Sequence, residues 1–194
     1  MDPESFCAVV LAGGRGSRLG GVDKAAVEVD GRTLLAHALD AVREAAEVVV
    51  VGEEARTAPP GRPVTFVVEE PRHGGPAAGL LTGCDALVRT PAQAPRVAVV
   101  AVDMPRLTAA TVRRLHAAAR GRDGAVLVGP DGRRQLALVV DRVRLAAVAP
   151  GPEDRNGTAV WRLLEPLDLA EVAATGQEHR DVDTWTDVRD LDVP

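Results

Sequence analysis

The sequence predicts an α/β protein of three layers, in which helices cover both faces of a mostly parallel, mixed sheet. Short and almost continuously apolar runs alternate with helical patterns, which is typical of buried parallel strands joined by helices. The 194 residues are 46% hydrophobic but only 2% aromatic, a composition that suits close packing of helices on a valine-rich sheet. A chain of this length buries one good core, so we expect a single domain over residues 1–194.

The first half of the chain holds the predicted parallel strands. Valine-rich runs place them at 6–12, 48–51, 64–68 and 97–102. Apolar residues spaced along one helical face predict helices over 34–42 and 77–87. A third helix is expected after Pro105, with Thr108 as its N-cap.

The second half predicts a change of strand direction. The runs 125–128 and 136–140 flank a Gly-Pro-Asp-Gly turn at 129–132, which indicates a hairpin and therefore one antiparallel strand. A segment rich in proline and glycine at 149–157 precedes a short helix at about 159–164 and a strand near 167–172. The last helix is expected after Thr184.

Charge and composition exclude several classes of partner. The net charge of -5 argues against a general binder of nucleic acid or of anionic membranes. We see neither an export pattern at the first residues nor an apolar stretch long enough to span a bilayer, and we expect a cytoplasmic protein. Cys7 and Cys84 lack metal-ligand spacing and are interpreted as small buried hydrophobic residues.

A glycine-rich loop follows the first predicted strand, where open α/β sheets bind ligands. Over residues 11–24 it contains Gly13, Gly14 and three cations, Arg15, Arg18 and Lys24. Glycines allow backbone N–H groups to surround an anion, and the cations supply positive charge. The loop therefore predicts a triphosphate site rather than an ordinary solvent loop, in which crowded cations would repel one another.

Two other phosphate-binding motifs do not fit this loop. The dinucleotide fingerprint fails because Leu19 stands where its third glycine belongs, and because residues 25–31 indicate an extended segment ending in a turn instead of a helix. A P-loop needs Gly-Lys-Ser/Thr, whereas Lys24 follows Asp23 and precedes Ala25. Lys24 is also the only lysine in the chain, and its compact ammonium suits a place between phosphates. We predict that it is catalytic.

Two aspartates are candidates for holding Mg²⁺. Asp103 follows the fourth strand, at the same sheet edge as the glycine-rich loop, and such a carboxylate can hold the metal against triphosphate oxygens. Its alternative role is an ordinary turn or capping residue before Pro105. Asp183 is either a second carboxylate near the metal or, like Thr184, an N-cap of the last helix. Gly75 opens a predicted helix whose first N–H groups suit an anion or a base edge, although a plain turn fits equally.

Four motifs in this order resemble the molybdenum-cofactor guanylyltransferase family. They are the Leu-Ala-Gly-Gly opening that continues to Lys24, the Gly-Pro-Ala-Ala-Gly segment at 75–79, Val-Asp-Met-Pro at 102–105, and Val-Asp-Thr at 182–184. The resemblance implies a Rossmann-like nucleotidyltransferase fold and Mg²⁺ as cofactor. It implies nucleotide contacts from Leu11, Ala12, Gly13, Lys24, Glu70 and Asp103, and metal binding by Asp103. From the residues themselves we add Gly14 and Gly75 as nucleotide contacts, Arg15 and Arg18 beside Lys24 and Asp103 as catalytic residues, and Asp183 as a second metal ligand.

The function that this resemblance implies is transfer of GMP from GTP to the phosphate of molybdopterin, with pyrophosphate leaving. GTP and molybdopterin are then the small-molecule partners, and maturation proteins of molybdoenzymes are further candidates. Ala12-Gly13-Gly14 resembles the guanylyl enzymes more than the Ala-Ala-Gly of their cytidylyl relatives. The open alternatives are a cytidylyltransferase of the same pathway, a transferase for another small phosphorylated acceptor, and a non-catalytic GTP-binding assembly factor.

Overall fold

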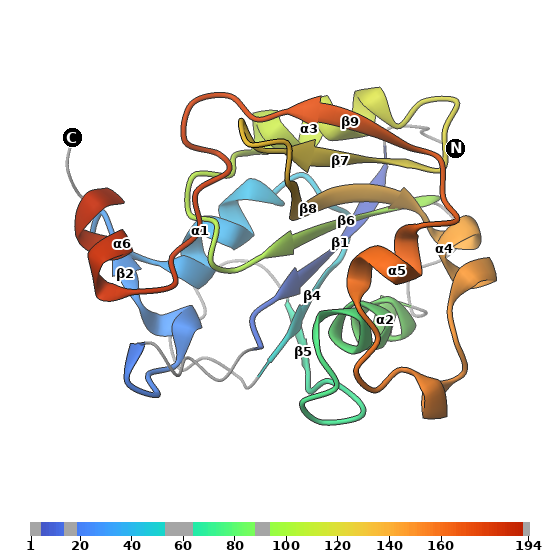
Figure 1. The fold of residues 1–194 in the computed structure, drawn as a ribbon, viewed down its shortest axis with the longest axis horizontal. Helices are drawn as coiled ribbons and strands as arrows, with labels where there is room; N and C mark the ends of the chain where they lie inside the picture. The colour runs from blue at the N-terminus through green and yellow to red at the C-terminus, as the bar shows by residue number, and fades with distance from the viewer. Residues whose placement is uncertain (1–4, 14–18, 53–63, 88–93, 192–194) are drawn as a thin grey trace.

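A seven-stranded mixed sheet forms the centre of the computed structural model, which describes residues 5–13, 19–52, 64–87 and 94–191. The strand order is β5-β4-β1-β6-β8-β7-β9 (Figure 1). The strands are β1 (Phe6–Leu11), β4 (Val48–Val51), β5 (Thr65–Val67), β6 (Arg96–Ala101), β7 (Gly124–Val128), β8 (Arg134–Asp141) and β9 (Leu169–Ala173). All neighbouring pairs are parallel except the two that involve β8. The predicted single antiparallel strand is confirmed within this sheet.

The register of the three central parallel strands makes them end at the same edge of the sheet. Leu11 of β1 pairs with Val51 of β4 on one side and with Ala101 of β6 on the other. The three parallel strands therefore end side by side, so the loops that follow them meet at one edge. Every residue of β1 is buried, as expected for a strand covered on both faces.

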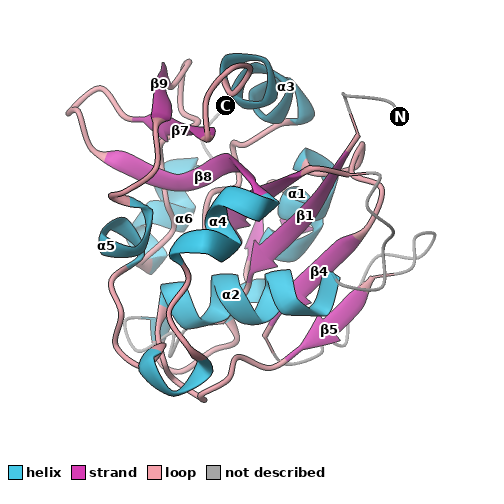
Figure 2. Cartoon of the chain, turned by 90° about the vertical axis from the view of Figure 1, so that its right-hand side faces the viewer, coloured by secondary structure: helices cyan, strands magenta, loops and turns pink. Residues whose placement is uncertain are grey.

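Helices cover both faces of the sheet, and the three predicted layers are confirmed. One core cluster contains Ala8 and Val10 of β1 and joins them to α1 (Leu34–Ala41), α3 (Ala109–Ala118) and α6 (Trp185–Leu191). The other contains Val9 and Leu11 and joins them to α2 (Pro76–Ala86), α4 (Arg142–Val148) and α5 (Val160–Leu164). Figure 2 shows α2 and α4 in front of the sheet and α1 behind it.

The predicted helix starts agree with the structure where a cap is present. Thr108 caps α3, and its side chain and that of Thr111 accept each other's backbone N–H groups in a capping box. The helix α4 was not predicted, because it is short and buries only Leu145 while Val143 is 76% exposed. Asp141 starts it by accepting a hydrogen bond from the N–H of Arg144.

The expected extended segment at 25–31 is only partly correct. It begins with a 3-10 turn, η2 (Lys24–Ala26), and continues into a two-stranded ribbon, β2 (Glu28–Val29) and β3 (Arg32–Thr33). Asp30 and Gly31 connect these strands with positive φ angles of 52° and 68°, which an Asp-Gly pair tolerates in a tight hairpin. The extended pattern did not reveal η2, which carries Lys24.

The helices of the described residues are all too short or too polar to span a bilayer.

Candidate active site

Lys24 lies between two carboxylates that come from distant parts of the chain. Its Nζ donates to Oδ2 of Asp103 at 2.9 Å and to Oδ1 of Asp183 at 2.8 Å. The Lys24 side chain is 13% exposed, whereas those of Asp103 and Asp183 are 26% and 43% exposed. The ammonium is thus covered, and the carboxylates face the solvent side of the cluster.

The 3-10 turn η2 holds Lys24 in place. Asp23 caps the turn by accepting a hydrogen bond from the N–H of Ala25 at 3.0 Å. Ala25 and Val27 are almost fully buried in the first core cluster, so they anchor the turn on both sides of the exposed Ala26. Because these two residues are buried, the turn is fixed and holds Lys24 at the sheet edge.

Backbone hydrogen bonds position Asp103 and the segment of Asp183. Val102 follows β6 and donates to the carbonyl of Leu11 at 2.9 Å, which fixes the start of the Asp103 turn against the end of β1. The carbonyl of Asp103 accepts from the N–H of Val182 at 2.8 Å, and Val182 is fully buried. The main chain therefore brings the two aspartates together at the sheet edge.

Thr184 rather than Asp183 caps α6. The Thr184 hydroxyl accepts from the N–H of Asp187 at 3.3 Å, and an Asp187 carboxylate oxygen accepts from the N–H of Thr184 at 2.7 Å. These reciprocal bonds form a capping box. The Asp183 carboxylate is consequently available to pair with Lys24, and the capping alternative for this residue is not what the structure shows.

The charges of the cluster affect its protonation. Burial alone would favour the neutral amine, but the charges and hydrogen bonds of Asp103 and Asp183 raise the pKa of Lys24 above its ordinary value. Lys24 is therefore an ammonium at neutral pH.

A third carboxylate, Asp181, is affected by the charges of the same cluster. Its pKa is raised first by loss of solvent and then by the negative charges of Asp103 and Asp183. Asp181 was not among the predicted site residues, although its alternation with Asp183 was a usable signal.

The donor set suits a hard cation held in part by substrate. Asp103 and Asp183 offer carboxylate oxygens, the ligands that Mg²⁺ prefers. No group of three or more His, Cys, Asp or Glu side chains with metal-binding geometry occurs in the described ranges. Such a pair fits a metal that takes its other ligands from phosphate and water.

A comparison with protein families identifies the chain. The MobA-like NTP transferase domain matches residues 8–172, a span that includes most of β1 and all of η2, α2 and Asp103. The chain belongs to this family. The resemblance shown by the four motifs and the prediction of a nucleotidyltransferase are thereby confirmed.

Family relatives match over long parts of the chain. A molybdenum cofactor guanylyltransferase of Shewanella loihica is 34% identical over 143 residues, covering 72% of this chain and 69% of the relative. A protein of Opitutus terrae, named a probable molybdenum cofactor guanylyltransferase, is 33% identical over 98% of this chain and 95% of its own length. Among solved structures, Rv0371c of Mycobacterium tuberculosis H37Rv has a TM-score of 0.74 at 28% identity and covers 96% of both chains. One structure of that protein is a complex with manganese, with a TM-score of 0.71 at 26% identity.

The remaining predicted residues lie around this cluster or outside the described ranges. Leu11 and Ala12 are buried at the end of β1, and the exposed Gly13 follows them. The N–H of Ala12 donates to the carbonyl of Val51 at 2.9 Å, which fixes the first residues of the loop. Three predicted residues lie outside the described residues, namely Gly14, Arg15 and Arg18.

Glu70 and Gly75 lie on the connection between β5 and α2. The backbone N–H of Glu70 donates to the Thr82 hydroxyl at 3.0 Å, and its side chain is exposed. Gly75 has a φ of 94°, a conformation that favours glycine, and it starts α2 without a side-chain cap. The structure therefore places both residues beside α2, whereas Lys24, Asp103 and Asp183 form the contacting cluster.

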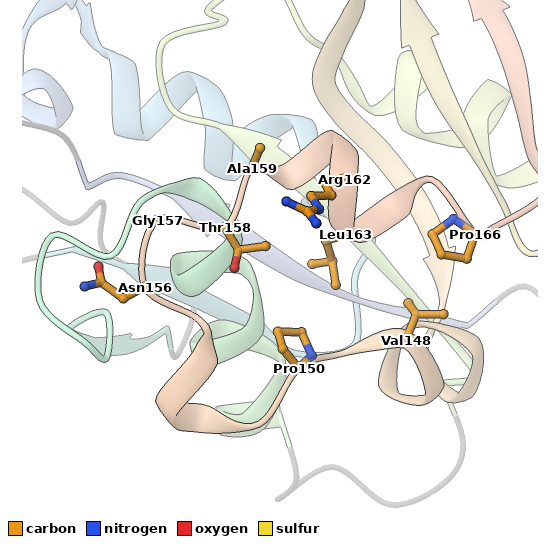
Figure 3. Close-up of a pocket in the computed structure, with 9 residues that line it drawn as sticks. All are labelled: Val148, Pro150, Asn156, Gly157, Thr158, Ala159, Arg162, Leu163 and Pro166. Carbon is orange, nitrogen blue, oxygen red and sulfur yellow. The ribbon is translucent and has the colours of Figure 1, made fainter.

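A pocket of about 480 Å³ lies between the end of α4 and α5 (Figure 3). Apolar side chains such as Val148 and Leu163 form much of its wall, and Asn156 and Arg162 add polar groups. One lining residue, Gly157, donates its N–H to the carbonyl of Gly74 at 3.0 Å. The pocket contains none of the predicted site residues.

Proposed function

We propose that this chain, acting as one nucleotidyltransferase domain, transfers GMP from GTP to the terminal phosphate of molybdopterin. The observation that supports the proposal most strongly is the cluster in which Lys24 joins Asp103 and Asp183 at the carboxyl edge of the parallel strands. Relatives named molybdenum cofactor guanylyltransferase support the choice of both substrates.

The proposed reaction is a single in-line displacement. An ionised oxygen of the acceptor phosphate attacks the α-phosphorus of GTP and forms a new P–O bond. The bond between the α-phosphorus and the bridging oxygen of the β-phosphate breaks, and pyrophosphate leaves with that electron pair. Because the attacking phosphate is already ionised, no side chain has to remove a proton, and the protein acts by positioning and charge stabilisation.

Each proposed residue has a distinct task. Lys24 exchanges carboxylate oxygens for phosphate oxygens and stabilises the charge that develops on the transferred group. Arg15 and Arg18 would orient the β- and γ-phosphates, while the backbone of Ala12 and Gly13 would lie against the nucleotide. Asp103 and Asp183 would hold Mg²⁺, which when bound neutralises triphosphate charge.

The test measures pyrophosphate release with molybdopterin as acceptor and GTP, CTP, ATP or UTP offered separately. We expect release with GTP and Mg²⁺, and a loss of at least about 100-fold in Lys24→Ala and Asp103→Ala, the size typical for removal of one preorganised charge-stabilising group. Asp40→Asn is a matched control, because this exposed carboxylate lies on α1 and pairs with the exposed Arg43 at 3.6 Å.

The outcomes separate the alternatives. Release with CTP instead of GTP would assign the cytidylyl activity. Tight binding of GTP without release from any nucleotide would refute the transferase proposal for this acceptor and favour an assembly factor. Full activity of Lys24→Ala would show that the cluster is not the reaction centre.

The single lysine allows a second, independent test. An amine-reactive reagent can modify only Lys24 and the N-terminus of this chain, so modification of Lys24 is unambiguous by mass spectrometry. We expect GTP with Mg²⁺ to slow its modification strongly, since the ammonium would then contact phosphate. Equal rates with and without nucleotide would contradict a nucleotide contact from Lys24.

A further inference from the structure

Trp185 is a half-exposed aromatic residue close in the chain to Asp183 of the proposed reaction centre. The chain contains only two tryptophans and is 2% aromatic, so large rings on its surface are rare. Trp185 is 50% exposed and begins α6 two residues after Asp183, whose carboxylate contacts Lys24. Apolar surface of an exposed ring is stabilised only when it is removed from water, which a bound ligand at this place would do.

The main chain that carries Trp185 is fixed on both sides. Before it, the N–H of Val182 donates to the carbonyl of Asp103 at 2.8 Å. After it, an Asp187 oxygen accepts from the N–H groups of Asp183 and Thr184 at 3.1 and 2.7 Å and from the Thr184 hydroxyl at 2.8 Å. Val188 and Leu191 then anchor α6 in the first core cluster. Trp185 is therefore carried by a rigid segment at a set distance from Asp183.

The side of the sheet on which Trp185 lies indicates which of the two substrates it can contact. The proposed nucleotide residue Gly75 precedes α2, which packs on the face of the second core cluster. The helix α6 belongs to the first cluster, on the opposite face, and packs beside β2 (Figure 1). The α- and β-phosphates of GTP would lie at Lys24, between these two faces. If the nucleobase lies near α2, the space beside α6 remains for the acceptor.

We propose that Trp185 stacks on the planar pyrimidine ring of the pterin in the phosphorylated acceptor and so selects acceptors that carry a flat heterocycle. This inference rests on the proposed function and adds a specificity-determining residue to it. The acceptor phosphate reaches the α-phosphorus beside Lys24, and its ring system lies against the indole. Stacking of a flat ring on an indole gives affinity without hydrogen-bond readout.

The experiment measures steady-state kinetics of Trp185→Phe and Trp185→Leu with molybdopterin and GTP varied in turn. Trp185→Leu retains an apolar side chain but no ring, and we expect its KM for molybdopterin to rise about tenfold, whereas Trp185→Phe stays within about threefold. The KM for GTP and kcat should remain unchanged in both, because only binding of the acceptor is weakened. Trp161→Phe is the matched control, since Trp161 lies on α5 at the opposite core cluster.

The results distinguish this inference from the proposed function. A wild-type enzyme that releases no pyrophosphate refutes the function itself. A wild-type enzyme that is active while Trp185→Leu keeps the wild-type KM for molybdopterin overturns the stacking proposal alone. An equal rise in KM for Trp185→Leu and Trp185→Phe, or a rise in the KM for GTP instead, would also overturn it. Thermal unfolding of each variant separates such changes from loss of structure.

Discussion

The replacement of Gly83 by alanine tests the close approach of α2 to the sheet. An alanine Cβ at this position would lie 2.5 Å from Cγ1 of Val9 and 2.9 Å from Cγ2 of Val51, whereas carbon atoms pack best at about 3.5–4.0 Å. Both valines are buried in neighbouring strands of the sheet, so either α2 must move outward or the valines must leave their preferred rotamers.

The expected cost follows from two opposing effects. Overpacking of a core of this kind costs about 1–3 kcal/mol, and alanine in place of a helical glycine returns about 1 kcal/mol of helix propensity. Because the closest contact would be only 2.5 Å, we place the overpacking cost in the upper part of its range, at about 2–3 kcal/mol, and expect Gly83→Ala to lower the free energy of unfolding by about 1–2 kcal/mol. On propensity alone the same substitution would stabilise the protein, so the sign of the change is informative.

Gly79 on the same helix supplies the control. An alanine Cβ there would meet its nearest neighbour, Cδ2 of Leu11, at 3.4 Å, which is ordinary contact. Urea unfolding followed by circular dichroism should show Gly79→Ala at least as stable as wild type and Gly83→Ala less stable. A Gly83→Ala variant with wild-type stability, or equal destabilisation of both variants, would refute the packing argument.

Three further predictions concern single side chains. Burial raises the pKa of Glu178, but hydrogen bonds from Arg114, Thr111 and the N–H of Thr175 lower it to below its ordinary value. Its contribution to stability is therefore present at neutral pH and is lost as the pH falls through the lowered value, so Glu178→Gln should cost about 1–3 kcal/mol at pH 7 and much less in acid. A constant difference in urea midpoint from neutral to acid pH would contradict this assignment. Cys84 is half-buried, and loss of solvent raises the pKa of its thiol to about 12, so that little reactive thiolate is present at pH 8, whereas Cys7 is fully buried. A thiol reagent at pH 8 should modify neither residue until urea unfolds the protein. Rapid modification of the native state would contradict this and show that the second core cluster unfolds locally. Lys24→Arg keeps the charge but replaces the compact ammonium with a planar guanidinium, and its pyrophosphate release should fall nearly as far as that of Lys24→Met. Wild-type turnover of Lys24→Arg would mean that positive charge alone is sufficient.

The sequence could predict those elements whose signals are local. The Gly-Pro-Asp-Gly turn at 129–132 was enough to predict the reversal at β8, because a short turn between two apolar runs leaves no room for a crossover. Thr108 predicted the start of α3 because a cap depends on residues only three positions apart. In contrast α4 has a single buried side chain and shows no apolar face, so its seven residues gave no helical pattern.

The contacts of the site depend on tertiary structure and were beyond a local prediction. Lys24 meets Asp103 across 79 positions and Asp183 across 159 positions of the sequence, and no local pattern predicts either contact. The capping of α6 is a more local feature, because Thr184 and Asp187 lie three positions apart and form a capping box that satisfies the start of the helix without the Asp183 carboxylate.

The same arrangement explains how residues so far apart in the sequence can form one cluster. A backbone hydrogen bond from the N–H of Val102 to the carbonyl of Leu11 holds the turn of Asp103 against the end of β1. A second one, from the N–H of Val182 to the carbonyl of Asp103, holds the segment of Asp183 against that turn. Both links use backbone atoms, so they constrain the path of the chain and leave the exposed side chains free to change. Trp185, attached to the last of these links, is therefore a position where the acceptor preference can vary while the distance between Lys24 and its carboxylates stays fixed.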